Sequence, residues 1–561
     1  MTNDFDPTQE SDVQDAPVSG ETQAARPSIA ARIVSGVDAG HYALSIWRTP
    51  QERIFASLSG AQRADHQPLD GPRVRAHLAS HYDRQHHSVP ADNTIRSAVS
   101  VLNVRAAASA PVHPTYVRVA GELDEAGNVR CVLLDLADAE GRAVEVTADG
   151  WRVLTNAEVV PRVKFMRTSR LAPLPVPMRG GSLATLRQYL NVSEADWPLV
   201  VAWLLNALRH IGPYTVLLLI GAEGTAKTTT AQLLRELIDP STLSPADQLA
   251  ETTLIGKEPE DIYLAATRCW VQSYGNVSHL PQRLSDVFAS LSTGGGTERR
   301  TKYTDLDETI FQASRPVILG GIDDFVHSRD LLDRAALLQP PKLSSKRPPA
   351  ELLRAYAVDR PAMLGALLDL LSVALRVAPT VEPPEGVRMV DAARMALALE
   401  KAGVAPWETG AFMAAARRVN REATRVVLDV NPFTRALREY VDARGAIDME
   451  LGQLLEAINA TASEDVKRLR EWPKNGRKIR ALLNRVSTSL EQSGYTVAYH
   501  QSSRDLSAVA IVAPKPPERS LEEQAADAER EAKVAAERAR ELRAKAAQAA
   551  AEKMAKKDAG L

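Results

Sequence analysis

The clearest hydrophobic pattern of the chain lies between residues 197 and 237, where three elements follow one another. Residues 197–210, "WPLVVAWLLNALRH", are apolar on all sides and predict a buried helix. The run "YTVLLLI" (214–220) is short, continuous and apolar, which is typical of a buried strand. The stretch "TTTAQLLREL" (228–237) has the spacing of an amphipathic helix. Strand–loop–helix units recur to about residue 340, so the fold class we predict is α/β.

The regions before and after this α/β part have different patterns of hydrophobic and polar residues. Residues 1–28 are polar and acidic and predict a disordered tail, and residues 29 to about 110 are mostly helical in pattern. Between 113 and 165, β-branched residues alternate with turn signals and predict a small antiparallel β unit. The proline-rich stretch 171–181 reads as a connector. The role of the β unit stays open at this point.

The C-terminal half changes character twice. Residues 434–513 combine helices with two short β-like runs, and the last forty or so are alanine-rich with balanced charge, which predicts a solvated single helix. The predicted domains are therefore a tail (1–28), a helical plus small β domain (29–180), an α/β core (181–348), a helical lid (349–433), a winged-helix-like domain (434–515) and a charged helix (516–561).

The composition of the chain excludes several classes of protein and of binding site. The chain has 561 residues and a formal net charge of −2, so any nucleic-acid contact would have to be local. Cys131 and Cys269 are far apart in sequence and have no partners at metal-ligand spacing, which favours a reducing cytoplasm. The N-terminus does not read as a secretory signal, and no apolar run reaches the roughly 18 to 20 residues that cross a bilayer. We expect a cytoplasmic protein without a membrane partner.

The loop between the strand 214–220 and the following helix has the spacing of a phosphate-binding loop. "GAEGTAKT" matches G-x-x-x-x-G-K-[ST], except that Ala226 replaces the glycine before Lys227. Such a loop points backbone N–H groups at phosphates, while the lysine reaches the β/γ-phosphates and the Thr228 hydroxyl reaches Mg²⁺. The expected cofactors are ATP and Mg²⁺, and the expected contacts are Gly221, Ala222, Glu223, Gly224, Thr225, Ala226, Lys227, Thr228 and Thr229.

A carboxylate that holds Mg²⁺ and orients water is missing from the expected place. The next strand, "RCWVQSYGN", ends in Gly275-Asn276, and the strand after it, "RPVILGG", ends in Gly320-Gly321. Asp323 and Asp324 follow one turn later. Either Asp323 acts as a surrogate metal ligand, or the site binds ATP and turns it over poorly.

The run "GAEGTAKTTTAQLLRELIDPST", with "WVQSYGNVSHLPQRLSDVFASLSTGGGTERRTKYTDLDETIFQASRPVILGGIDD" and "RDLLDRAALLQPP", resembles the primase-associated P-loop ATPases of phages and integrative elements. These are related to the superfamily-three helicase branch of AAA+ proteins. The resemblance covers about residues 175–430 and, more loosely, 65–515.

The resemblance implies residue roles. The family typically has aspartate where this chain has Gly275, forming an Asp-Asn pair, and a γ-phosphate-sensing asparagine where it has Gly320. It also implies that Arg334 completes the site of a neighbouring subunit; Arg329 is a lesser candidate. The catalytic set implied is Lys227, Thr228, Asn276 and Arg334.

Two basic regions are candidates for DNA contact. One is the glycine-hinged loop 293–305, which in ring helicases of this branch lines the pore, and the other is a helix opening near residue 475. A charged surface would give the same pattern in either place. The residues concerned are Arg299, Arg300, Lys302, Tyr303, Lys474, Arg477, Lys478 and Arg480.

The sequence thus favours an ATP-binding, helicase-like protein of a phage or mobile element. We expect it to act as a homo-oligomer on single-stranded or forked DNA, with a primase or other replication protein as a possible partner. Two alternatives stay open: a non-hydrolysing, ATP-dependent scaffold or clamp that assembles on DNA or on a partner, and a nucleotide-gated defence ATPase. Whether ATP is hydrolysed is not decided by these residues.

Overall fold

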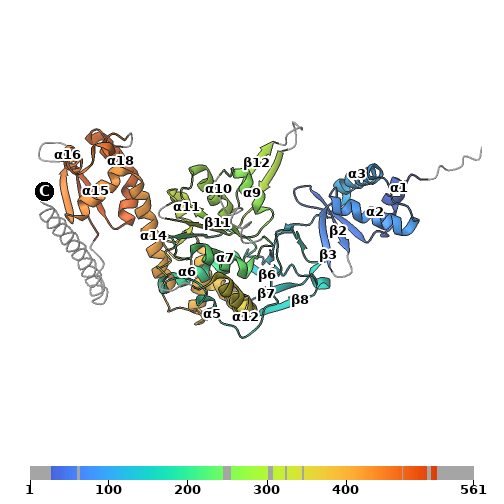
Figure 1. The fold of residues 1–561 in the computed structure, drawn as a ribbon. Helices are drawn as coiled ribbons and strands as arrows, with labels where there is room; N and C mark the ends of the chain where they lie inside the picture. The colour runs from blue at the N-terminus through green and yellow to red at the C-terminus, as the bar shows by residue number, and fades with distance from the viewer. Residues whose placement is uncertain are drawn as a thin grey trace, which may run out of the picture. The chain divides into compact units, whose positions relative to one another are not determined.

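The computed structural model describes residues 27–59, 63–243, 254, 256–300, 308–322, 325–343, 347–469, 472–501 and 507–514. It has a mixed α/β fold (Figure 1). The chain forms two compact units. The first contains Met1–Phe325 and Arg334–Ala415, and the second contains Val326–Asp333 and Ala416–Leu561. The charged helix predicted for 516–561 and nearly all of the N-terminal tail lie outside the described residues.

The N-terminal part of the first unit contains a three-stranded antiparallel sheet, in the order β1-β2-β3, together with three helices. A mostly helical region was predicted here, and that prediction is wrong for residues 44–68. The third strand, "ADHQP", carries no hydrophobic signal and forms by pairing with β2, where Phe55 lies opposite Pro68. The elements are α1 (Ile29–Asp38), β1 (Leu44–Arg48), β2 (Ile54–Ser59), β3 (Ala64–Pro68), α2 (Pro72–His86) and α3 (Asp92–Ser109).

The antiparallel β unit predicted at 113–165 is confirmed. Four strands form a meander in the order β5-β6-β7-β8, and two short strands pair beside it in parallel. Cys131, Leu133 and Phe165 belong to a buried cluster within this unit. The elements are β4 (Thr115–Tyr116), β5 (Val119–Leu123), β6 (Val129–Asp135), β7 (Ala143–Thr147), β8 (Gly150–Leu154), α4 (Asn156–Val159) and β9 (Lys164–Phe165).

A parallel sheet in the order β11-β14-β10-β15 forms the centre of the first unit. All five residues of β10 are buried, as the continuous apolar run predicted. Because the strands are parallel, β10, β11 and β14 end at the same edge of the sheet. The elements are α5 (Leu183–Arg187), η1 (Glu194–Asp196), α6 (Trp197–Ala207), β10 (Val216–Ile220), α7 (Lys227–Ile238), α9 (Pro259–Ala266), β11 (Gln272–Val277), α10 (Gln282–Thr293), β12 (Gly296–Arg300), β13 (Glu308–Gln312), β14 (Val317–Gly321) and β15 (Ala335–Leu338).

Three long helices follow the sheet, α12 (Pro349–Val377), α13 (Val390–Lys401) and α14 (Ala411–Val430), with the short 3-10 helix η2 (Ala378–Thr380) directly after α12. Among the described helices, α12 alone is long and apolar enough to cross a membrane, and 56% of its most apolar stretch is buried inside the protein. Trp151 Nε1 of the β unit donates to Asp369 Oδ1 on this helix at 2.7 Å, and Ser372 Oγ donates to the Thr147 carbonyl at 2.7 Å. These contacts are those of a core helix.

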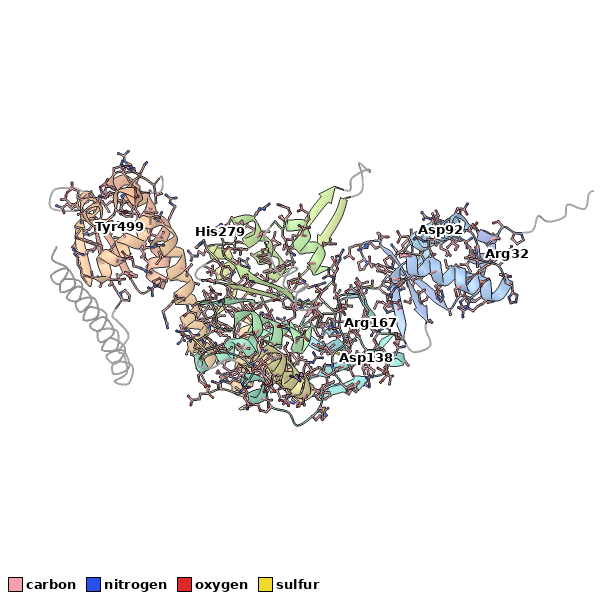
Figure 2. All side chains as sticks on the ribbon, in the orientation of Figure 1. Arg32, Asp92, Asp138, Arg167, His279 and Tyr499 are labelled. Atoms are coloured by element: carbon pink, nitrogen blue, oxygen red, sulfur yellow. The ribbon has the colours of Figure 1, made fainter. Side chains whose placement is uncertain are left out.

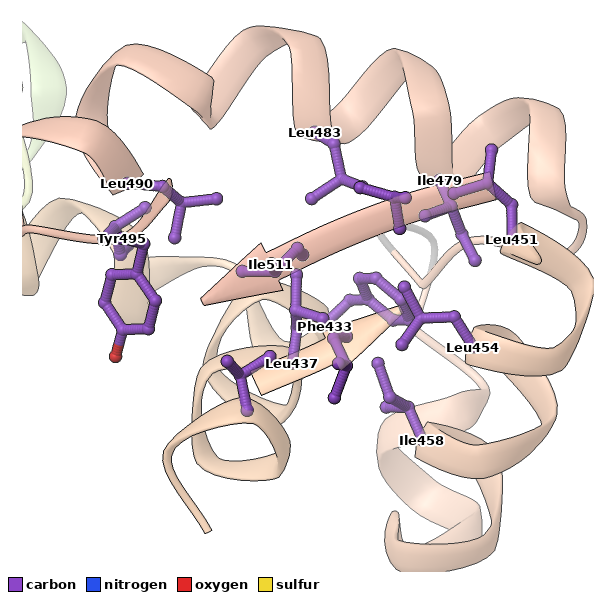
Figure 3. Packing of buried hydrophobic residues seen from close by; sticks show 14 of the residues in the cluster. Phe433, Leu437, Leu451, Leu454, Ile458, Ile479, Leu483, Leu490, Tyr495 and Ile511 are labelled. Atoms are coloured by element: carbon purple, nitrogen blue, oxygen red, sulfur yellow. The ribbon is translucent and has the colours of Figure 1, made fainter. Parts of the chain in front are cut away.

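The second unit has its own hydrophobic core (Figure 3), in which Phe433, Leu454, Ile479 and Ile511 converge from different elements. Its antiparallel sheet has the order β16-β18-β17. Along the chain its elements are α11 (Arg329–Leu332), α15 (Pro432–Asp442), β16 (Ala446–Glu450), α16 (Leu451–Thr461), α17 (Glu464–Lys467), α18 (Gly476–Gln492), β17 (Thr496–Gln501) and β18 (Ser507–Val512).

Candidate functional site

The loop 221–226 connects the carboxyl end of β10 to the first residue of α7. Gly224 and Ala226 both have left-handed backbone angles, with φ of 78° and 60°. These two residues turn the chain so that α7 begins directly after the loop. The positive end of the helix dipole and the N–H groups of the first turn therefore lie at this edge of the sheet, where an anion is stabilised.

Side chains brace this loop. Lys227 Nζ donates to the carbonyls of Gly221 and Ala222, both at 2.7 Å, and the buried Thr225 hydroxyl donates to Ala222 O at 3.0 Å. Asn191 Nδ2 donates to Thr225 O at 3.0 Å and to Pro341 O at 2.6 Å. No sequence pattern indicated Asn191, since it lies more than thirty residues before Thr225 and belongs to no motif. The loop is thus held in place even though its tip is exposed.

Near their ends, the strands β11 and β14 each carry a glycine at which an added Cβ atom would not overlap other atoms. A Cβ at Gly275 would meet no atom within 4 Å, and one at Gly320 would meet its nearest atom at 3.9 Å. Asn276 is exposed, has φ of 54°, and lies in a bulge between Tyr274 and Val277. Among the described residues no group of three or more His, Cys, Asp or Glu could hold a metal ion. Asp323 and Asp324 lie outside the described residues.

Arg334 lies at the opposite edge of the sheet from the loop. Its carbonyl accepts from Val216 N at 3.0 Å, at the start of β10. The far end of β10 is four residues away, which at the usual rise of a strand is about 13 Å. Arg334 is therefore not brought to the loop of its own chain. Arg329 belongs to the second unit, where its Nη1 donates to Ser489 Oγ at 2.9 Å.

The first basic region, residues 293–305, lies only partly within the described residues. Arg299 and Arg300 lie on β12, which pairs with β13 as an antiparallel hairpin, so this segment is a hairpin at the level of the backbone. Lys302 and Tyr303 lie outside the described residues.

The basic cluster of the second unit, defined as Lys474, Arg477, Lys478 and Arg480, is exposed at the start of α18. The Asn475 side chain caps this helix by accepting from Lys478 N at 3.0 Å. Tyr499 lies on β17 (Figure 2), and the Arg480 guanidinium is 5.2 Å from the centroid of its ring. Burial raises the pKa of Tyr499, and the charge of Arg480 opposes that shift.

A buried network that sequence patterns did not indicate joins the β unit to the central sheet. Arg118 Nε donates to Asp239 Oδ1 at 2.9 Å, and the two side chains are 0% and 1% exposed. Asp239 Oδ2 accepts from the amides of Trp270 and Val271, each at 2.9 Å. Arg167, in the β unit (Figure 2), pairs with the buried Asp135 at 2.6 Å. Asp239 directly follows α7, so the network holds the end of that helix remote from the loop.

Comparison with known proteins gives two family matches. Residues 183–416 match the model described as actinomycete integrative conjugative element replication protein, and residues 433–523 match the model described as AICE RepA C-terminal domain. No curated protein matches the chain.

Solved structures are only distantly similar. Two structures described as the A form apo structure of the NrS-1 C terminal region share 10% identity with this chain. One covers 87% of this chain and 100% of its own with a TM-score of 0.39, and the other covers 86% and 98% with 0.37. A JCV helicase structure shares 16% identity over 42% of this chain and 64% of its own, with a TM-score of 0.18. These TM-scores are too low to support an argument.

The prediction of a replication protein from a mobile element is confirmed by the family matches, which together span more than half of the 561 residues. Residues 183–416 and 433–523 are therefore similar to the RepA replication proteins of actinomycete integrative conjugative elements.

Proposed function

We propose that this protein is an ATP-binding, helicase-like protein that acts on DNA, and that residues 221–229 bind the triphosphate. The observation that carries the proposal is the position of the Lys227 side chain. Its amine lies against two loop carbonyls, directly at the N-terminus of α7 and at the carboxyl edge of a parallel sheet. Edges of this kind are where α/β proteins bind phosphorylated ligands.

The residues present fit ATP better than they fit the metal. Lys227 would hold the β/γ-phosphates, the first-turn amides of α7 would donate to phosphate oxygens, and the Thr228 hydroxyl would bind Mg²⁺. When bound, Mg²⁺ neutralises charge on the phosphate oxygens. The described ends of β11 and β14 offer no carboxylate to it, and Asp323 is the remaining candidate. Binding with weak turnover follows from this set of residues.

Arg334 gives a reason to propose an oligomer. On the edge remote from the loop it cannot complete its own site, whereas an arginine on that edge can reach the loop of an adjacent subunit. We therefore expect a homo-oligomer in which Arg334 acts in trans. Arg334→Ala should lower any hydrolysis without changing nucleotide affinity measured on isolated subunits.

Calorimetry with ATP tests the binding site. Lys227→Ala should weaken binding at least tenfold, because it removes the cation that faces the phosphates. Lys342→Ala is the matched control, since this lysine is exposed and closely follows β15, beside Pro340 and the loop, yet belongs to no motif. Equal affinity in wild type and Lys227→Ala would refute the assignment of the loop.

A second candidate function is a non-hydrolysing scaffold or clamp on DNA, and the two vacant positions at Gly275 and Gly320 favour it. DNA-stimulated ATP hydrolysis distinguishes the two. A wild type without turnover and a Gly275→Asp variant that hydrolyses ATP would support the scaffold, because the substitution restores a carboxylate where there is space for one. Measurable wild-type hydrolysis that depends on Lys227 would support the helicase-like enzyme.

For DNA, we propose the second unit as a winged helix. Its order of one helix and one strand, then helices, then two strands fits that module, and the basic cluster lies at the start of α18. Arg477→Ala and Lys478→Ala should each weaken DNA binding and reduce the salt dependence of affinity by about one phosphate contact. Arg485→Ala, an exposed arginine farther along α18, is the control. If the salt dependence of DNA affinity is unchanged in all variants, the contact with DNA lies elsewhere. The β12–β13 hairpin is then the next region to test.

A further inference from the structure

The outward face of α15 lines a groove in the second unit that the proposed function leaves unused. The groove has a volume of about 350 Å³. Its lining includes three small side chains, Ala436, Ala443 and Ala462, which let another backbone approach closely. Ala436 on α15 and Ala443, the residue that caps its carboxyl end in a right-handed helical conformation, are seven residues apart and therefore lie on the same side. A surface of this shape accepts a helix that also presents small residues.

The rim of the groove is charged. Arg435, Glu439 and Arg444 line it and are exposed. The Arg444 guanidinium lies 3.6 Å from the centroid of the Tyr440 ring, which also lines the groove. Arginines beside a small-residue floor favour an occupant with acidic residues next to its small ones.

The chain leaves the described structure at one end of this groove. Ala513 N donates to Gly445 O at 2.8 Å, and Gly445 directly follows Arg444. The described part ends at Pro514, and residues 515–561 continue from there. The C-terminal segment therefore starts beside the groove, at the carboxyl end of α15.

The sequence of this segment matches the groove. Ser520 and Glu523 have the spacing of a capping box, which predicts a helix that begins at Leu521. From Leu521 on, small or apolar residues recur at alternating intervals of four and three, a spacing that lines one face of a helix. This stripe consists of Leu521, Ala525, Ala528, Ala532, Ala535, Ala539 and Leu542. Residues 518–531 contain six acidic residues and two arginines, which complements the arginines of the rim.

We propose that the C-terminal segment of the same chain docks in this groove, with the stripe that begins at Leu521 against Ala436 and Ala443. Because the segment starts at the carboxyl end of α15, it runs antiparallel to that helix. The 11 residues of α15 span about 16 Å, which is the length of roughly three turns of the docked helix. Residues 514–519 connect the two. The docking does not depend on nucleotide binding.

Cysteine cross-linking in the full-length chain tests the proposal. Ala443→Cys is combined in turn with Ala525→Cys, Ala528→Cys or Ala532→Cys on the stripe. The matched control is Ala526→Cys, the same substitution on another face of the predicted helix. The native Cys131 and Cys269 are both buried. We expect intramolecular disulfides at stripe positions to form at least tenfold faster than at the control, with Ala436→Cys preferring later tail positions than Ala443→Cys. Equal rates of disulfide formation at the stripe and control positions would overturn the proposal. Disulfide-linked dimers in place of intramolecular disulfides would overturn it as well.

Filling the groove provides an independent measurement. Ala443→Trp occupies the floor, and Ala481→Trp adds the same ring at an exposed position of α18. Hydrogen exchange of the amides of residues 521–535 should be at least tenfold faster in Ala443→Trp than in the wild type and unchanged in Ala481→Trp. Identical exchange in the three proteins would refute docking.

Discussion

Ala226 is the residue at which the loop 221–226, proposed to bind phosphate, departs from the consensus spacing, and its backbone conformation carries an energetic cost. Its backbone angles, φ 60° and ψ 26°, lie in the left-handed region. An L-residue with a side chain costs about 1–2 kcal/mol there relative to right-handed geometry, whereas glycine adopts it freely. Replacing alanine by glycine also adds about 0.4–1 kcal/mol of unfolded-chain entropy. Ala226→Gly should therefore stabilise the loop by a net amount of roughly 0.5–1 kcal/mol.

Ala222→Gly is the matched control in the same loop. Ala222 is not among the residues with positive φ, so glycine there relieves no strain and should destabilise by about 0.5–1 kcal/mol. The stability of the loop should differ between the two variants by about 1–2 kcal/mol. This corresponds to a factor of roughly 5 to 30 in the equilibrium constant for local opening. Hydrogen exchange of the first turn of α7, where Thr230 N donates to Ala226 O at 2.9 Å, measures this opening. Exchange that is faster in Ala226→Gly than in the wild type would refute the strain argument.

Three further predictions follow from buried positions. Gly320→Ala should change the thermal midpoint little, because its Cβ would meet its nearest atom at 3.9 Å, whereas Gly321→Ala should lower it markedly, because its Cβ would overlap Val277 O and the Phe325 ring. Equal midpoints would contradict the described end of β14. Arg118→Met should destabilise the first unit by about 3–5 kcal/mol in urea denaturation, since it leaves the Asp239 carboxylate buried without its charge partner, and a loss below 1 kcal/mol would contradict this. Burial lowers the pKa of His66 to about 4 from 6.5, so the unfolded chain binds a proton between those pH values that the folded chain does not. Stability should thus fall by about 3 kcal/mol from pH 7 to pH 4 and level off below, and His66→Gln should remove that part of the pH dependence.

The sequence predicted the parts of the fold that local patterns encode. The apolar run of β10, the amphipathic α7 and the alternation in the β unit each specify their element without help from distant residues. The spacing that predicts a phosphate-binding loop at 221–228 is local as well, and the binding itself stays a prediction. β3 was missed because its residues are polar and only pairing with β2 makes them a strand. Asn191 was missed for the same reason, since its contact with the loop depends on the folding of the chain between them.

The role of the β unit shows most clearly why sequence patterns were insufficient. Arg118 has φ of 64°, a conformation that costs an arginine about 1–2 kcal/mol and that no local preference predicts. It is maintained because the guanidinium donates to Asp239, to the Asp135 carbonyl at 3.0 Å and to the Ala172 carbonyl at 2.7 Å. These contacts cross from the β unit to the end of α7 and, through Asp239, to the residues that lead into β11. The β unit is therefore part of the frame that fixes both α7 and β11, the two elements on which the loop and the vacant position at Gly275 depend.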